Sequence, residues 1–298
     1  MKRVLADRRG AVLVEFALVA LAATLLLSAT VDLGRLVFTA QVIQDAARAG
    51  ARELSVTPLP AAITFDAALS YVDPATLQQP VRLRVFDPDR LVIDTTGMTD
   101  ADLDLIYASL PIVNKILRPA MITDRISIGG AERTLLRYPG ALLEDAASAS
   151  GFSVLIPRVT GRTVDGVETV EWIPVAEEVR ADPSDPTTGP FSLVPGAAIA
   201  SGLVALRINY PFQAATMSSF RPNPLGPFEP NLGNVNIADD AAVSAPPTGG
   251  TLVDSTGGGG VYAGPYGLGR QFAFAGQTVR PFRRLLSSQA VYRREVFQ

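Results

Sequence analysis

The chain has 298 residues, of which 48% are hydrophobic, and its formal net charge at pH 7 is −3. It contains no cysteine and no histidine, which excludes disulfides, thiolate chemistry and imidazole-based acid–base catalysis or metal binding. With no basic footprint for nucleic acid either, we expect no nucleic-acid partner, no catalytic, cofactor-binding or metal site, and no enzymatic activity.

The N-terminus combines a short basic leader with a long apolar segment. The leader, residues 1–10, carries Lys2, Arg3, Arg8 and Arg9 against Asp7. In residues 11–31 the one charged residue is Glu15. As a helix this segment is about 32 Å long, enough to cross a bilayer. The positive charges predict a cytoplasmic N-terminus and an exported remainder.

Three interpretations of this segment compete. A secretory signal peptide would use Ala20-Leu21-Ala22 as its cleavage site, but the apolar run continues well beyond it. A plain signal anchor fits the length and the orientation but leaves the carboxylate in lipid unexplained, a cost of roughly 2–3 kcal/mol or more. The third interpretation is a type IV prepilin signal, cut after Gly10 so that Ala11 becomes the N-terminal residue and Glu15 the fifth. It accounts for the basic leader, the Gly10/Ala11 junction and Glu15 together.

The helical pattern continues past the apolar run. Apolar and small residues recur every three or four positions, and no proline lies between positions 11 and 57, so we expect one helix over residues 11–54. Small residues such as Ala46 and Gly50 lie one turn apart and would let another backbone approach closely. The partner of this face is either the chain's own C-terminal domain or a neighbouring subunit, or each of them along a different stretch of the helix.

Residues 55–298 differ from the long helix in their residue pattern and predict a domain with a mostly antiparallel sheet. Pro58 and Pro60 end the helix. We expect a short helix over 61–71, a strand over 81–86, and a helix that Thr99 and Asp102 begin and Pro111 splits. Further strands are expected at 125–129, 133–138, 152–158, 167–173 and 203–212. With the long helix, this gives an α+β fold in which a sheet packs on the second half of that helix.

The C-terminal third is less regular. Residues 223–269 are rich in proline and glycine and are predicted to be loop. The tail, residues 271–298, holds several arginines, and we expect it to be a solvated helix face, with lipid, a glycan or a partner subunit as alternative contacts. Trp172 is expected to be a core or partly buried residue of a strand.

Two acidic groups superficially suggest calcium. The group formed by Asp100, Asp102 and Asp104 lacks the glycine and glutamate that an EF-hand loop requires, so we interpret it as the acidic first turn of a helix. Asp87 and Asp89 flank a proline in an apparent turn, which is a common place for aspartate. We therefore predict structural roles for both.

Three blocks in the first 52 residues together resemble the TadE-like family, small membrane pseudopilins of tight-adherence (Flp-type) pilus systems. The blocks are an Arg-Gly junction followed by Val-Glu-Phe-Ala, then Val-Asp-Leu-Gly-Arg, then an Ala-Ala-Arg segment, at residues 9–18, 31–35 and 44–52. Many relatives carry a proline in the apolar run. Its absence here predicts a straighter helix.

The resemblance implies a minor pilin or pseudopilin that a prepilin peptidase cleaves after Gly10. The processing and assembly residues would be Gly10, Ala11 and Glu15, with Asp32, Gly34 and Arg35 as a family-matched block at the membrane interface. Implied partners are the peptidase, other pilin subunits, the pilus assembly platform and the lipid of the bacterial inner membrane. The alternative is a membrane-anchored binding or scaffold protein outside the cytoplasm that never enters a filament.

Overall fold

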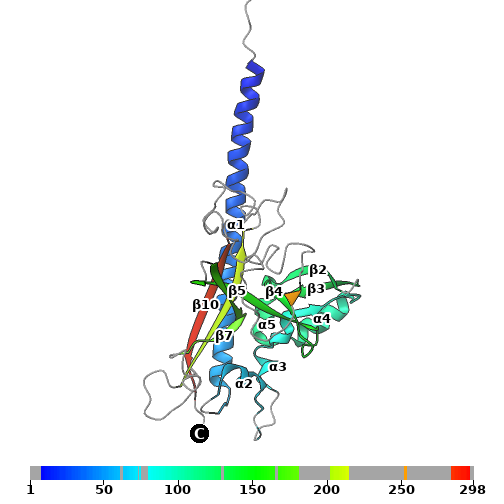
Figure 1. Cartoon of the computed structure of the whole chain (residues 1–298), viewed down its shortest axis with the longest axis vertical. Helices are drawn as coiled ribbons and strands as arrows, with labels where there is room; N and C mark the ends of the chain where they lie inside the picture. The colour runs from blue at the N-terminus through cyan, green and yellow to red at the C-terminus, as the bar shows by residue number, and fades with distance from the viewer. Residues whose placement is uncertain are drawn as a thin grey trace, which may run out of the picture.

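The computed structural model describes residues 8–60, 63–72, 74, 80–128, 131–164, 167–180, 202–214, 252–253 and 283–295. Its dominant element is the helix α1, Arg8–Val56, of 49 residues. At 1.5 Å per residue α1 is about 73 Å long. We call the remaining helices and strands the body. Figure 1 shows that the first half of α1 stands clear of the body, while its second half lies along it.

The sheet that packs on α1 has the order β10-β8-β7 and is antiparallel throughout. Its strands are β7 (Ala176–Glu178), β8 (Leu203–Gln213) and β10 (Arg283–Arg293). β8 and β10 pair over their whole length without a register shift. Val204, Leu206 and Ile208 of β8 are fully buried, in the same core as Ala46 and Ala47 of α1. The sheet and the helix thus form the two-layer unit that the sequence predicts.

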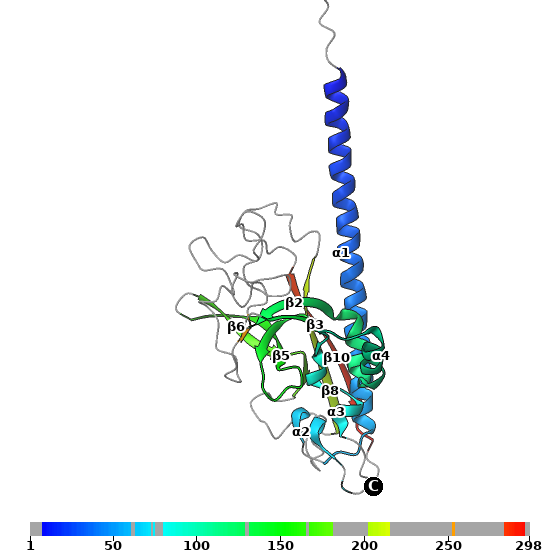
Figure 2. The ribbon, with the colours of Figure 1, turned by 90° about the vertical axis from the view of Figure 1, so that its right-hand side faces the viewer.

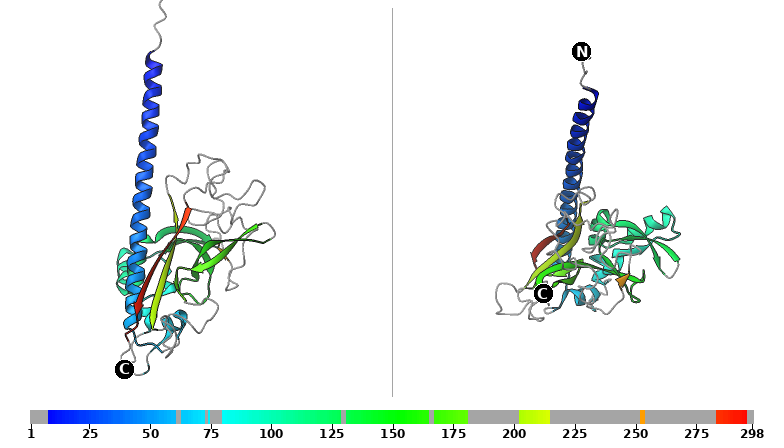
Figure 3. Two further views of the ribbon diagram at one scale, coloured as in Figure 1. Left: turned by 90° about the vertical axis from the view of Figure 1, so that its left-hand side faces the viewer. Right: turned by 45° about the horizontal axis from the view of Figure 1, so that its top comes forward.

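The rest of the body extends to one side of this unit, as Figures 2 and 3 show. It contains two further antiparallel sheets, of order β1-β3-β2 and β6-β5-β4-β9. The strands of these sheets are β1 (Val92–Asp94), β2 (Ile122–Ile128), β3 (Ala131–Arg137), β4 (Ala141–Glu144), β5 (Phe152–Val164), β6 (Val167–Pro174) and β9 (Leu252–Val253). The α+β prediction is confirmed.

Short helices connect these strands. They are α2 (Phe65–Ser70), α3 (Val81–Arg84), α4 (Asp100–Ser109) and α5 (Ile112–Leu117), with 3₁₀ turns at Pro88–Leu91 and Arg118–Ala120. The split at Pro111 is confirmed. The predicted start of α4 is confirmed as a capping box, in which Asp102 accepts hydrogen bonds from Thr99 and its pKa is lowered in consequence.

Two sequence-based predictions are wrong. The expected strand over 81–86 begins with helix α3. Its alternating pattern also places Val81 and Val85 one turn apart, and both are buried while Leu83 is exposed. Within the arginine-rich tail, Arg283–Arg293 form strand β10 rather than a helix, and the exposed residues alternate along the strand at 287, 289, 291 and 293.

A buried tyrosine joins the rest of the body to the sheet that packs on α1. Tyr138 is fully buried, its hydroxyl donates to the carbonyl oxygen of Asn209 at 2.7 Å, and its ring packs edge-on against Tyr210. Burial, together with the neighbouring Tyr210, raises the pKa of the Tyr138 phenol well above its ordinary value. The tyrosine therefore acts as a neutral hydrogen-bond donor.

Replacing Tyr138 by phenylalanine should lower the free energy of unfolding by about 1–2 kcal/mol, because the Asn209 carbonyl loses its donor in a dry core. Urea unfolding of the full chain in detergent measures this loss. The matched control is Tyr107→Phe on α4, which keeps the ring beneath Arg118 and should cost less than about 0.5 kcal/mol. Equal losses in the two variants would contradict the role assigned to the buried hydroxyl.

The end of β10 is attached to the end of α1. The amide of Glu295 donates to the Ser55 carbonyl at 3.1 Å. The Arg294 guanidinium donates to the carbonyls of Pro60, at 3.0 Å, and Leu59. Desolvation lowers the pKa of Arg294. The last strand of the chain thus fastens the segment that leaves the first helix.

Candidate functional site

The first half of α1 is an apolar rod with no protein around it. From Val12 to Val31 no residue is buried, and the exposed large side chains include Val12, Leu13, Val14, Phe16, Leu18, Val19, Leu21, Leu26, Leu27 and Val31. This stretch is about 30 Å long, which matches the hydrocarbon core of a bilayer. By length and composition α1 is a candidate single membrane span.

Glu15 lies on this rod among apolar side chains. It is exposed, and within the described part of the chain no hydrogen bond or ion pair holds its carboxylate. Gly10 and Ala11 belong to the first turns of α1. Ala11 precedes Glu15 by four residues, so their backbones lie on consecutive turns of one face, about 6 Å apart. The helix therefore brings together the three predicted processing residues.

The polar threonines of the rod are satisfied within the helix. The hydroxyls of Thr24 and Thr30 donate to the carbonyls of Ala20 and Leu26, each at 2.8 Å. Such bonds to the preceding turn remove the need for water inside a bilayer. Glu15 therefore differs from the other polar side chains of the rod for which a bond is described.

The block Asp32, Gly34 and Arg35 marks the point where α1 leaves the rod and joins the body. Asp32 is 5% exposed and is the first buried residue along α1 for which burial is described. An Arg35 guanidinium nitrogen lies 3.7 Å from the Asp32 carboxylate. Gly34 has open space where a side chain would be. The three residues share one turn, but the structure gives Gly34 no contact in common with the ion pair.

The small-residue face of α1 packs on the chain's own body. Ala46, Ala47 and Ala51 have no exposed surface. A side chain at Gly50 would meet Leu206 at 2.7 Å and Val113 at 2.8 Å. Of the two partners considered for this face, the structure therefore assigns the body. A neighbouring subunit can meet α1 only on its other faces.

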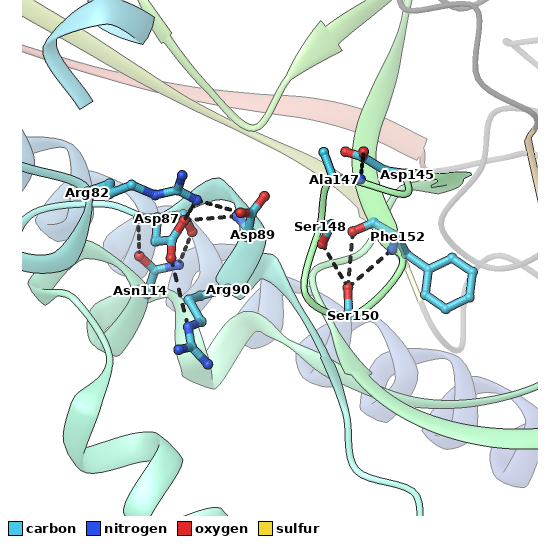
Figure 4. A network of polar contacts seen from close by, with 10 residues as sticks. All are labelled: Arg82, Asp87, Asp89, Arg90, Asn114, Asp145, Ala147, Ser148, Ser150 and Phe152. Carbon is cyan, nitrogen blue, oxygen red and sulfur yellow. Dashed lines mark hydrogen bonds and ion pairs between the residues drawn. The ribbon is translucent and has the colours of Figure 1, made fainter. Parts of the chain in front are cut away.

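Asp87 and Asp89 form an arginine-bound network (Figure 4). Asp87 is buried, and its carboxylate accepts from Arg82 at 2.8 Å, while Asp89 also binds Arg82. These contacts raise the pKa of the Arg82 guanidinium, and the hydrogen bond to Asp87 has the largest effect. Asn114 and the backbone of Asp87 exchange two hydrogen bonds of 2.9 Å. The network fixes the turn between α3 and β1 to α5, a structural role that the turn pattern alone did not specify.

The remaining polar features are also structural. Figure 4 shows a second turn in which Asp145 accepts from the amide of Ala147 and Ser150 binds the backbone of Phe152. Among the described residues no three metal-ligating side chains gather in one place. The side chain of Trp172 and most of the loop 223–269 lie outside the described residues.

A comparison with protein families gives one match, to the family described as TadE-like protein, over residues 10–52. Residues 10–52 are a TadE-like segment. The match begins at Gly10, spans the apolar rod and ends where α1 is buried against the body. Neither a curated protein nor a solved structure matches the chain. The TadE-like segment supports a protein associated with the tight-adherence pilus and its components.

Proposed function

We propose that this chain is a minor pilin or pseudopilin of a tight-adherence type IV pilus, with a structural rather than a catalytic role. The observation that carries the proposal is the bare rod of α1, because it has the length of a bilayer, bears a single carboxylate and lies inside the TadE-like segment. The basic leader supports a cytoplasmic N-terminus, with the body outside the inner membrane.

Processing gives Glu15 a partner. A prepilin peptidase cuts after Gly10, and the new ammonium group of Ala11 lies one helical turn from Glu15. An ionised carboxylate in hydrocarbon requires such a partner. The amine of the same chain or of the adjacent subunit supplies it, and pairing between subunits fixes the axial register of each helix as it is added to the assembly platform.

Mass spectrometry of the chain co-expressed with an active prepilin peptidase tests the processing step. We expect the mature protein to begin at Ala11. A chain that keeps its leader would contradict the proposal in favour of a plain anchor. A chain that begins after Ala22 would show a secretory signal peptide instead.

Glu15→Gln tests the assembly step. We expect the variant to be processed but to be recovered in sheared pili about tenfold less than the unmodified chain, because the amide cannot hold the Ala11 ammonium group in lipid. Asp45→Asn is the control, an exposed acid on the same helix outside the span, and should assemble normally. Equal recovery of both variants would refute the register role.

A further inference from the structure

Helix α4 is an element of the body that buries nothing of its own. None of its ten residues is buried, and Leu105 is 72% exposed. The capping box holds its start, and the Arg118 guanidinium lies 3.6 Å from the centre of the Tyr107 ring. Helices of soluble domains normally bury an apolar stripe, and a helix this short is marginal alone. Its apolar residues Leu103, Ile106 and Tyr107 are only half-buried, and the face turned away from them has no partner among the described residues.

That face carries two carboxylates at helical spacing. Asp100 and Asp104 are exposed, one turn and about 6 Å apart. Leu105 is also exposed and lies about a quarter turn round the helix from Asp104. Asp102 is different, since its carboxylate is used by Thr99. Within the described residues neither Asp100 nor Asp104 forms an ion pair. The exposed surface of α4 therefore carries two unpaired negative charges, with a large apolar side chain at its edge.

The outward face of α1 carries the complementary charges. Arg48 and Arg52 are exposed and are also one turn and about 6 Å apart. In the described part of the chain neither guanidinium is paired, and Arg48 makes no ion pair with Asp45 on the preceding turn. Val56, 38% exposed, adds an apolar side chain on the next turn. The small-residue face of α1 is used by the body, so this outward face is the one that remains open.

The two faces do not meet within one molecule. Figure 1 shows α4 at the margin of the body, with α5 between it and α1. We propose that α4 of one copy docks on the outward face of α1 in a second copy, so that Asp100 and Asp104 pair with Arg48 and Arg52 while Leu105 covers the apolar surface beside them. The interface joins two different faces, and such contacts repeat head to tail into rings or filaments.

The proposal rests on the proposed function in that both copies stand in one membrane with the same orientation. The absence of natural cysteines permits a direct test in vesicles that contain the full chain. One tagged population carries Ala101→Cys on α4, and the other carries Ala49→Cys on α1. Each cysteine follows the first charged residue of its pair, so a short bismaleimide should join the two populations whichever way α4 runs.

Charge reversal gives the decisive comparison. D100R/D104R in the first population, or R48D/R52D in the second, should lower the cross-link yield about tenfold, because two ion pairs become two like-charge contacts. Both reversals together should restore the yield. Asp66→Arg on α2 and Arg84→Asp on α3, both exposed, are matched controls and should leave the yield unchanged.

The interface would be overturned if the cross-link yield did not change on charge reversal. It would also be overturned if the combined reversal failed to restore the yield in chains whose unfolding curves are unchanged. This result is distinguishable from failure of the proposed function. Cleavage after Gly10 is read on the same samples by mass spectrometry, and a cleaved chain without cross-links retains the pilin assignment while losing this contact.

Discussion

Replacing Gly50 by valine should destabilise the packing of α1 on the body by about 3 kcal/mol. The first added carbon would lie 2.7 Å from a methyl carbon of Leu206 and 2.8 Å from one of Val113. Both neighbours are fully buried and belong to different elements, β8 and α5, so neither can move without disturbing the core. Overpacking of this kind typically costs about 1–3 kcal/mol, and a branched side chain lies at the upper end.

Urea unfolding of the full chain in detergent, followed by circular dichroism, measures the effect. Gly34→Val is the matched control, because it makes the same substitution in the same helix where nothing lies within 4 Å. It should change stability by less than about 0.5 kcal/mol. If both variants unfolded at the same urea concentration, the body would not be held against this face of α1.

Replacing Asp87 by alanine should lower the free energy of unfolding by about 2 kcal/mol. The variant removes a buried carboxylate that binds Arg82 at 2.8 Å and accepts the backbone amide of Asp89 at 3.2 Å. Breaking a buried pair commonly costs about 3–5 kcal/mol. The loss is smaller here because Arg82 is partly exposed and keeps Asp89 as a partner.

Asp94→Ala is the control for this variant. Its carboxylate lies 3.7 Å from Arg133 and accepts the exposed amide of Thr96 at 2.9 Å. Both side chains of the ion pair are partly exposed, so removal of the carboxylate should cost less than about 1 kcal/mol. Asp87→Asn should fall between the two, because the amide keeps an oxygen acceptor for the Asp89 amide. A loss at Asp87 no larger than that at Asp94 would show that the network of Figure 4 is peripheral to stability.

The sequence predicts the parts of the fold that depend on local patterns. α1 follows from an unbroken helical period without proline, and α4 follows from Thr99 and Asp102 three residues apart. The strands β2, β3, β5, β6 and β8 fall where alternation is clear. Each of these signals lies within a dozen residues, so no knowledge of distant partners is needed.

The errors concern segments whose structure depends on distant partners. β10 is a strand because it pairs with eleven residues of β8. The sequence around its arginines contains no signal that identifies β8 as its neighbour. The pattern over 81–86 suits a strand or a helical turn, and burial of Val81 and Val85 decides for the turn. The small-residue face at Gly50 indicates close packing, but only Leu206 and Val113 identify what packs there.

The residues of the candidate site can be predicted from the sequence, but their arrangement in space is less predictable. Gly10, Ala11 and Glu15 follow from their spacing, and the helix brings them onto successive turns. Their roles in processing and assembly remain predictions. The exposed charges of α1 and α4 have no sequence signature, because acidic and basic residues four apart occur on many helices, and only the missing burial of α4 distinguishes them.

The attachment of Glu295 and Arg294 to the end of α1 has a consequence for biosynthesis. Residues near position 55 emerge from the ribosome long before the strand that fastens them, so one side of the central strand β8 stays unpaired until residues 283–293 have been made. Long-range pairing of this kind makes folding slow. A chain that lacks β10 would leave one edge of β8 unpaired, and an open edge of this kind can pair with another chain and aggregate.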